Sequence, residues 1–157
     1  MASSKTIVLI SGANQGIGCG ISEKLATETL LTMSIWDAVP SPKAEAAASS
    51  FSNLAIEALE LDISSDSSIS KAFATVEGKF GHLDVLINNA GISQRALPEG
   101  LTTRQRYAQI MDTNAISAAC LPETFIPLLC KSPQPRIIFM SSELGSIGDT
   151  LNPASQY

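Results

Sequence analysis

The stretch SGANQGIG, residues 11–18, follows the apolar run IVLI and carries three glycines in eight residues. Gly12 permits a tight turn, while Gly16 and Gly18 let the backbone and the following helix approach a bound group closely. The start of a helix attracts anions, because its first N–H groups have no partner within the helix. The stretch therefore predicts a cradle for the phosphates of a dinucleotide. A plain glycine corner between a strand and a helix is the alternative.

The bulk composition limits the class of protein. The 157 residues are 45% hydrophobic and 16% charged, which suits one globular domain over residues 1–157. The net charge of −5, without a basic stretch, argues against nucleic acid or an acidic membrane surface as the main partner. The apolar runs are too short for a signal peptide or a membrane span. The three cysteines and the single histidine, His82, lack metal-type spacing, so we expect no metal site and a reducing, cytoplasmic compartment.

Strand-like apolar runs alternate with helix-like stretches along the chain. Strands are expected at residues 5–11, at 31–37, over the latter half of 53–62 with its end at Asp62, at 83–91 and at 136–142. Helices are expected at residues 17–31, 42–51, 64–81, with a Ser/Asp cap and a terminal glycine, and about 102–131. Pro122 and Pro127 are expected to bend the last helix, because neither has an N–H.

This alternation predicts an α/β fold with a doubly wound parallel sheet and helices on both faces. In such sheets ligands bind at the carboxyl ends of the strands, near the point where the strand order reverses. The polar clusters of the sequence all fall at such ends: residues 11–18, Asp37, Asp62, NNAG at 88–91 and SSELG at 141–145. We therefore expect a single functional edge.

Asp37 supports the dinucleotide interpretation. It ends the second expected strand about 20 residues after the last glycine, where an acid can bond a ribose 2′-hydroxyl. Its carboxylate would repel a 2′-phosphate, and neither Asn14 nor Gln15 is basic, which favours NAD(H) over NADP(H). Lys43 in the following loop keeps NADP(H) open. A capping or merely solvated carboxylate is the alternative for Asp37.

The glycine spacing is G-x-x-x-G-x-G with Ser11 before it, and NNAG follows at residues 88–91. With Asp62 in LDIS, Asn114 in DTNAIS and the strand IIFMSSELGS, the chain resembles the short-chain dehydrogenase/reductase family, over all 157 residues. The resemblance implies a Rossmann-like fold whose C-terminal part, a helix, two strands and a substrate-covering segment, is missing here. The run RIIFM would then form an unpaired sheet edge, and we expect the isolated chain to aggregate.

The resemblance also implies which residues bind the cofactor. They belong to the glycine loop and to the ends of the second, third and fourth strands: Gly12, Asn14, Gly16, Ile17, Gly18, Asp37, Asp62, Ile63, Asn89, Ala90 and Gly91. The first five would wrap the pyrophosphate and its ribose, Asp62 and Ile63 would border the adenine, and the last three would line the cofactor. For Asn88 and Asn89, stabilisation of the sheet edge is the alternative.

The resemblance implies hydride transfer between the nicotinamide and a ketone or secondary alcohol. In the family a Y-x-x-x-K pair exchanges the proton, a serine bonds the substrate oxygen and an asparagine supports a water relay. Ser142 matches the serine, with Ser141 as competitor, and Asn114 matches the asparagine, with back-bonding to its own helix as the alternative. Tyr157 is either the family's tyrosine or part of a longer loop, and no lysine follows it.

Two functions are therefore open. The first is an NAD(P)-dependent oxidoreductase that acts on a small carbonyl or alcohol, with a homo-oligomer possible in the full-length form. The second is a truncated, catalytically silent protein that binds a dinucleotide without turning over a substrate.

Overall fold

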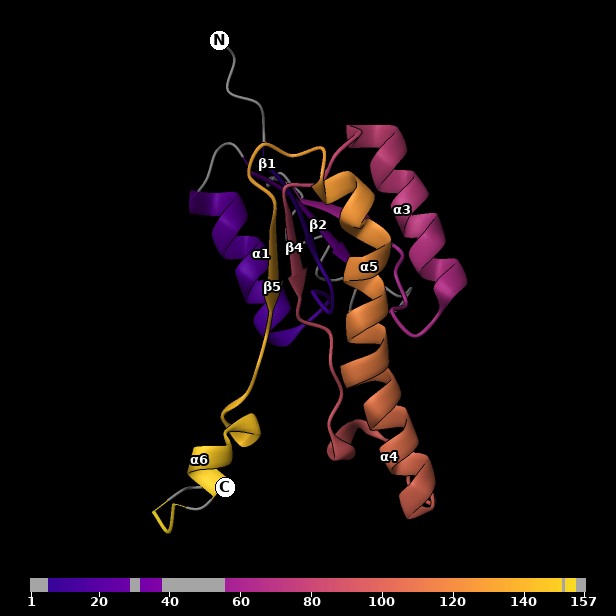
Figure 1. Ribbon diagram of the computed structural model, residues 1–157, viewed down its shortest axis with the longest axis vertical. Coiled ribbons are helices and arrows are strands. Elements are labelled where there is room, and N and C mark those ends of the chain that lie inside the picture. Colours follow the sequence, from indigo (N-terminus) through magenta and orange to yellow (C-terminus); the bar gives the residue numbers. More distant parts are fainter. Residues whose placement is uncertain (1–5, 29–31, 38–55, 151, 155–157) are drawn as a thin grey trace.

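The computed structural model of the protein describes residues 6–28, 32–37, 56–150 and 152–154 (Figure 1). Five strands form one sheet: β1 (Thr6–Ile10), β2 (Thr32–Asp37), β3 (Ile56–Leu59), β4 (Val85–Asn88) and β5 (Arg136–Phe139). The helices are α1 (Gly16–Glu28), α3 (Asp66–Phe80), α4 (Thr103–Met111), α5 (Ala118–Leu129) and the short α6 (Ile147–Thr150). A π-helical stretch, Asp112–Ser117, joins α4 to α5, and two 3₁₀ turns lie at Gln94–Ala96 and Glu143–Gly145.

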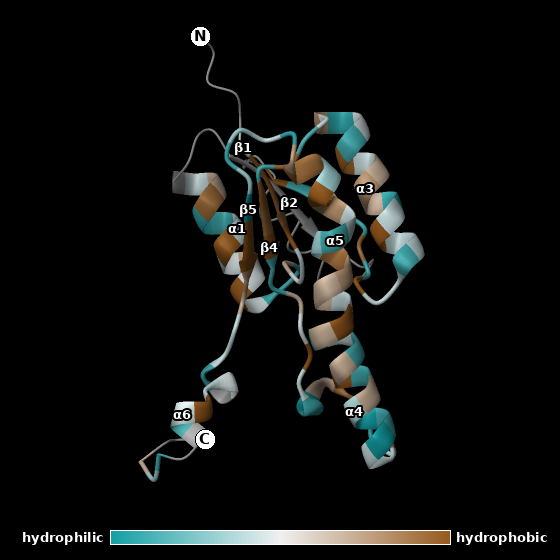
Figure 2. Ribbon diagram, in the orientation of Figure 1, coloured by the Kyte–Doolittle hydropathy of each residue, from teal (hydrophilic) through white to brown (hydrophobic). Residues whose placement is uncertain are grey.

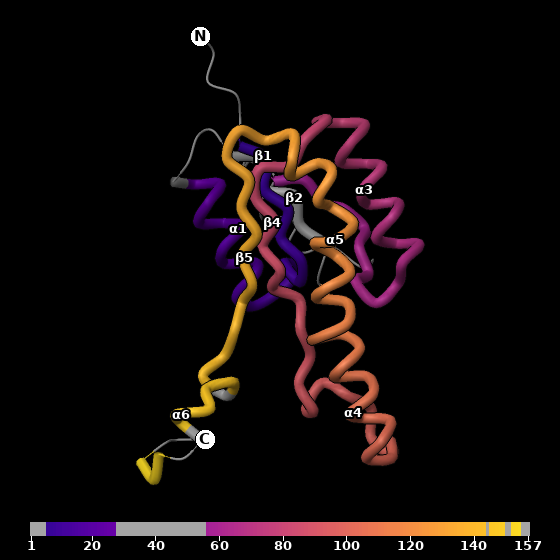
Figure 3. The backbone as a smooth tube through the Cα atoms, in the orientation of Figure 1, coloured from indigo at the N-terminus to yellow at the C-terminus, as the bar shows by residue number. Residues whose placement is uncertain are grey.

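The strand order is β3-β2-β1-β4-β5, and every neighbouring pair is parallel. The order reverses between β1 and β4, where Leu9 is paired with Leu86 and Ile10 with Ile87. Figure 3 shows these two strands side by side although they are far apart in the sequence. The expected doubly wound parallel sheet is confirmed.

Helices cover both faces of the sheet, because the side chains of a strand alternate between the faces. Ile7 and Leu9 of β1 are buried in a core cluster with the inward residues of α3 and α5. Val8 and Ile10 point the other way and pack with residues of α1. Figure 2 shows the hydrophobic residues gathered on the strands, with hydrophilic residues on the outer sides of the helices.

The ends of α3 follow the capping signals of the sequence. Ser65 is the N-cap, and its hydroxyl accepts a hydrogen bond from the Ser68 N–H at 3.3 Å. Gly81 closes the helix with a φ of 73°, a left-handed conformation that favours glycine, and its N–H donates to the Glu77 carbonyl. The prediction for this helix is confirmed at both ends.

Other boundaries differ from expectation. The third strand ends at Leu59 rather than Asp62, and Leu59 is paired with Asp37, the last residue of β2. The irregularity of the long helix is the π-helical stretch, whereas Pro122 and Pro127 both lie inside α5. The helix expected at residues 42–51 lies outside the described residues.

The amino edge of the sheet is tied together by Asp84. One of its carboxylate oxygens accepts from the Ile7 N–H at 2.7 Å, and the other accepts from the Ser132 hydroxyl at 2.5 Å. These bonds join β1, the start of β4 and the turn before β5.

β5 lies at the end of the strand order and pairs with β4. Ile137, Ile138, Phe139 and Met140 are each between 41% and 59% exposed. The expected apolar sheet edge is present. In the described part of the chain, no helix is long and apolar enough to cross a membrane.

Candidate functional site

The ends of β1 and β4 are interlocked at the point where the strand order reverses. The buried Ser11 hydroxyl accepts hydrogen bonds from the Asn89 N–H at 3.1 Å and the Ala90 N–H at 3.0 Å. In return, the Asn89 side-chain amide donates to the carbonyl oxygens of Ser11, at 2.9 Å, and Gly12, at 3.1 Å. The glycine loop is thus bonded to the NNAG segment, and these bonds correspond to the sheet-edge stabilisation that was the alternative for Asn89.

The glycines of the loop differ in whether there is space for a side chain. A Cβ on Gly12 would lie 2.7 Å from the Ala90 Cα, and one on Gly18 would lie 2.5 Å from the Gly12 carbonyl oxygen. Both positions therefore exclude a side chain. Gly16 has a φ of 59°, but a Cβ there would meet nothing within 4 Å. The loop is closed against the protein at Gly12 and Gly18 and open at Gly16, where α1 begins.

The start of α1 combines this open space with an exposed apolar side chain. Ile17 is 68% exposed, while Asn14 is half-buried in the loop before the helix. The free N–H groups of a first helical turn are suited to an anion, and the space beside Gly16 admits one.

Asp62 and Ile63 follow β3 and differ in exposure. The Asp62 carboxylate accepts from the backbone N–H and the hydroxyl of Ser64, at 2.9 and 2.6 Å, and the Asp62 N–H donates to the Ser68 hydroxyl. The Ile63 side chain is buried in the core formed with α3 and α5. Its backbone, rather than its side chain, is therefore the part available at this edge.

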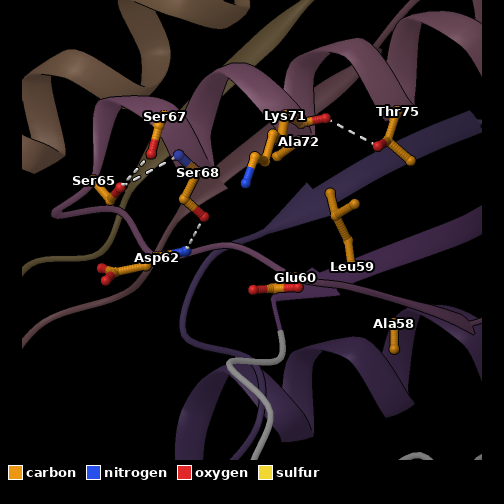
Figure 4. A pocket seen from close by; sticks show the side chains of 10 residues that line it. All are labelled: Ala58, Leu59, Glu60, Asp62, Ser65, Ser67, Ser68, Lys71, Ala72 and Thr75. Carbon is orange, nitrogen blue, oxygen red and sulfur yellow. Dashed lines mark hydrogen bonds between the residues drawn. The ribbon is translucent and has the colours of Figure 1, made fainter.

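A hollow of about 500 Å³ lies between the end of β3 and the first turns of α3 (Figure 4). Asp62, Glu60, Ser68 and Lys71 are among its lining residues. The glycine loop is not among them, so this hollow is separate from the interlocked ends of β1 and β4.

Asn114 lies in the π-helical stretch and reaches across to the loop after β4. Its Oδ1 accepts from the Ile92 N–H, and its Nδ2 donates to the Ile92 carbonyl oxygen, both at 2.8 Å. A Cβ on Gly91 would lie 3.3 Å from the same Oδ1. The side chain thus holds a neighbouring segment and does not bond back to its own helix. Irregular π-helical turns of this kind are frequent at functional sites.

Asn88, the last residue of β4, makes a contact that was not expected. Its side-chain amide, 5% exposed, donates to the carbonyl oxygen of Ala118 at the start of α5, at 2.5 Å. The sequence carries a signal for this bond: Pro122, four residues after Ala118, cannot supply the regular helical donor.

Asp37, Ser141 and Ser142 also lie at or beyond the carboxyl ends of their strands. Asp37 is the last residue of β2, but its side chain is outside the described residues, as is Tyr157. Ser141 and Ser142 are exposed beyond the end of β5, and the Ser142 carbonyl closes a turn with the Gly145 N–H at 3.0 Å.

Cys19 lies in α1, close to the glycine loop, and the pKa of its thiol is raised. Burial raises the pKa of its thiol, and the Glu23 carboxylate, four residues along α1, raises it further. The thiol is therefore held in its neutral form. Among the residues that the structure describes, no group of three His, Cys, Asp or Glu side chains is placed to hold a metal ion.

Known proteins match this chain over most of its length. A family model described as short chain dehydrogenase matches residues 6–154. The chain is 38% identical over 161 aligned residues to the short-chain dehydrogenase anuI of Penicillium roqueforti, which covers 99% of this chain and 63% of the relative. It is 35% identical over 156 residues to a short-chain dehydrogenase/reductase of Aspergillus fumigatus, with 96% and 60% covered.

Solved structures agree with this match. An NADPH-bound carbonyl reductase from chicken fatty liver is 29% identical, with a TM-score of 0.79 over 95% of this chain and 64% of that protein. A menthone neomenthol reductase from Mentha piperita is 25% identical, with a TM-score of 0.78 over 90% and 62%. The chain spans about 60% of the length of the curated relatives named here.

Proposed function

The chain belongs to the short-chain dehydrogenase family, and from this we propose that it binds a nicotinamide dinucleotide at the carboxyl edge of its sheet. In this proposal it supplies the cofactor-binding part of an oxidoreductase for a ketone or secondary alcohol. The observation that carries the proposal is the glycine loop, which is closed at Gly12 and Gly18, where Ala90 and Asn89 lie close, and open at Gly16.

The pyrophosphate would lie over the start of α1. The first-turn N–H groups supply hydrogen bonds to phosphate oxygens without a basic side chain, which suits a chain of net charge −5. Asn14 and Ile17 flank this position, and Ile17 would contact the cofactor with a side chain that is now exposed to solvent.

The adenosine half would lie toward β2 and β3. The proposed partners are Asp37 for the ribose hydroxyls, with Asp62 and the backbone of Ile63 beside the adenine. Because the carboxylate of Asp37 disfavours a 2′-phosphate, NAD(H) is the cofactor proposed first. NADP(H) is the second candidate, since the related chicken reductase is described with NADPH bound.

The nicotinamide half would lie beyond Asn89, Ala90 and Gly91. A bound nicotinamide supplies or accepts the hydride. In this proposal the Ser142 hydroxyl donates a hydrogen bond to the substrate oxygen, where negative charge develops. Asn114 orders the loop after β4 by holding both backbone groups of Ile92, which fixes the floor of the site.

Calorimetric titration of the 157-residue chain with NADH and NADPH tests the proposal. We expect saturable binding of NADH that is tighter than the binding of NADPH. Tighter NADPH binding would reverse the cofactor preference while keeping the site. If neither dinucleotide binds to the folded chain, the proposed function is wrong.

A further inference from the structure

Pro122 leaves a gap in the hydrogen bonding of the long helix. In a regular α-helix, the N–H of residue 122 would donate to the carbonyl of residue 118, and proline has no N–H. The Ala118 carbonyl therefore lacks its ordinary helical donor. Ala118 and Pro122 lie on the inner part of α5, since Pro122 is buried, so water is a poor substitute there.

Asn88 takes the place of the missing donor. Its Nδ2 lies 2.5 Å from the Ala118 carbonyl oxygen, although the two residues are on different elements, β4 and α5. Its Oδ1 is also buried and has no hydrogen-bond partner among the described residues. The bond to Ala118 is therefore the hydrogen bond that orients the buried Asn88 amide, since the Oδ1 atom makes none. Losing it would leave the whole amide buried without a hydrogen bond, which is costly.

This bond is one of three side-chain hydrogen bonds among the described residues that join the long helix to the end of β4 and the loop after it. Asn88 holds Ala118, and Asn114 holds Ile92, so the segments 88–92 and 114–118 are bonded at both of their ends. The second segment contains the end of the π-helical stretch, Asp112–Ser117. The first segment contains Asn89, Ala90 and Gly91.

We propose that Pro122 and Asn88 form a matched pair that fixes how α5 sits on the end of β4. Pro122 opens the Ala118 carbonyl, Asn88 binds it, and the helix is thereby held in the register at which Asn114 reaches Ile92. Asn88 is a positioning residue, because it acts on the 89–91 segment through the helix and through Asn114. Only the last link, from this segment to the dinucleotide, rests on the proposed function.

The pair makes a specific prediction about rescue. Asn88→Leu keeps the approximate size of the side chain but removes the donor and the unpartnered oxygen. Pro122→Ala returns the N–H that the Ala118 carbonyl lacks, so it should repair the effect of Asn88→Leu. Pro127→Ala is the matched control, because it also removes a proline from α5 but returns its N–H to the carbonyl of Glu123, an exposed residue.

Amide hydrogen exchange of Ile92, followed by NMR in the 157-residue chain without cofactor, measures directly whether Asn114 still holds Ile92. We expect Asn88→Leu to speed this exchange about tenfold, the effect of weakening one hydrogen bond. The double variant with Pro122→Ala should return to within about threefold of the parent rate, and the one with Pro127→Ala should not. Equal exchange rates in the two double variants would overturn the proposal.

If Asn88→Leu alone does not fold, thermal melts of the two double variants give the same decision. Folding restored by Pro122→Ala and not by Pro127→Ala supports the pair. Failure of both, or rescue by both, overturns it.

Titration with NADH distinguishes a failure of the Pro122–Asn88 pair from a failure of the proposed function. If the variants show the expected exchange pattern but the folded parent chain does not bind NADH, the Pro122–Asn88 pair is supported and the proposed function is refuted. A parent that binds NADH with an affinity unchanged in Asn88→Leu would overturn the positioning role of Asn88. The expected result is an affinity weakened about tenfold by Asn88→Leu and restored by Pro122→Ala.

Discussion

Individual atoms decide which glycines of the first loop are replaceable. A Cβ on Gly18 would lie 2.5 Å from the Gly12 carbonyl oxygen and 2.6 Å from the Asn89 Nδ2, the atom that bonds the loop to β4. A Cβ on Gly20, two residues later in the same helix, would meet nothing within 4 Å. The two positions look alike in the sequence and differ completely in space.

Gly18→Ala is therefore expected to abolish NADH binding and to lower the melting temperature, because the loop must move away from Asn89. Gly20→Ala should keep binding and stabilise the helix by about 0.5 kcal/mol, since alanine loses less backbone freedom on folding. Calorimetric titration and thermal melts of both variants measure this. Retained binding in Gly18→Ala would show that the loop is not packed as described.

The cysteines should differ in reactivity. Burial and the Glu23 carboxylate raise the pKa of Cys19, so less of the reactive thiolate is present near neutral pH, whereas Cys130 is exposed. Iodoacetamide labelling followed by peptide mass spectrometry should find Cys130 modified well before Cys19.

The raised pKa of Cys19 also determines how its contribution to folding stability depends on pH. A pKa raised in the folded state keeps the thiol neutral there, while the unfolded thiol ionises first as the pH rises. The contribution of Cys19 to stability is thus complete below the unfolded pKa and is lost as the pH rises through the folded pKa. Glu23→Gln should speed labelling of Cys19, and labelling of Cys19 ahead of Cys130 would contradict this assignment.

At the scale of helices and strands, local signals were readable from the sequence and partner-dependent ones were not. Ser65 and Gly81 predicted both ends of α3, because a cap acts within its own turn. The end of β3 at Leu59 depends on where β2 ends, and the π-helical stretch accompanies the contact of Asn114 with Ile92. Neither distant partner is visible in the local sequence.

The two glycines of α3 give a stability test for this element. Gly78 lies inside the helix with open space where a Cβ would be, while Gly81 has a φ of 73°. Gly78→Ala should raise the free energy of unfolding by about 0.5 kcal/mol, and Gly81→Ala should lower it by about 1 kcal/mol. Urea unfolding of both variants measures the difference, and changes of the same sign would contradict it.

The whole molecule presents one apolar edge. The alternation of strands and helices was enough to predict the parallel sheet, since connections in such sheets follow few rules. The resemblance to the short-chain family, in which further strands follow, predicted β5 as an edge, and its exposed residues Ile137 to Met140 lie there. The arrangement of the site was less predictable, because Asn88 and Ala118 meet only once the sheet and α5 are packed.

We expect the 157-residue chain to self-associate through β5 at micromolar concentration. Ile138→Lys places a charge on this edge and should shift size-exclusion elution toward the monomer, as lysines do on natural edge strands. Ile147→Lys is the control, because it adds the same charge to an 85% exposed residue of α6, away from the strand. Monomeric elution of the parent chain would refute the expectation.

The pairing of β1 with β4 also has a consequence for the chain while it is being synthesised. Ser11 must wait for the N–H groups of Asn89 and Ala90, which are made 78 and 79 residues later. Until then β1 has only β2 on one side, and its other edge is open on the ribosome. A nascent chain halted before β4 should therefore be a substrate for chaperones, whereas one extended beyond Ala90 can close the centre of its sheet.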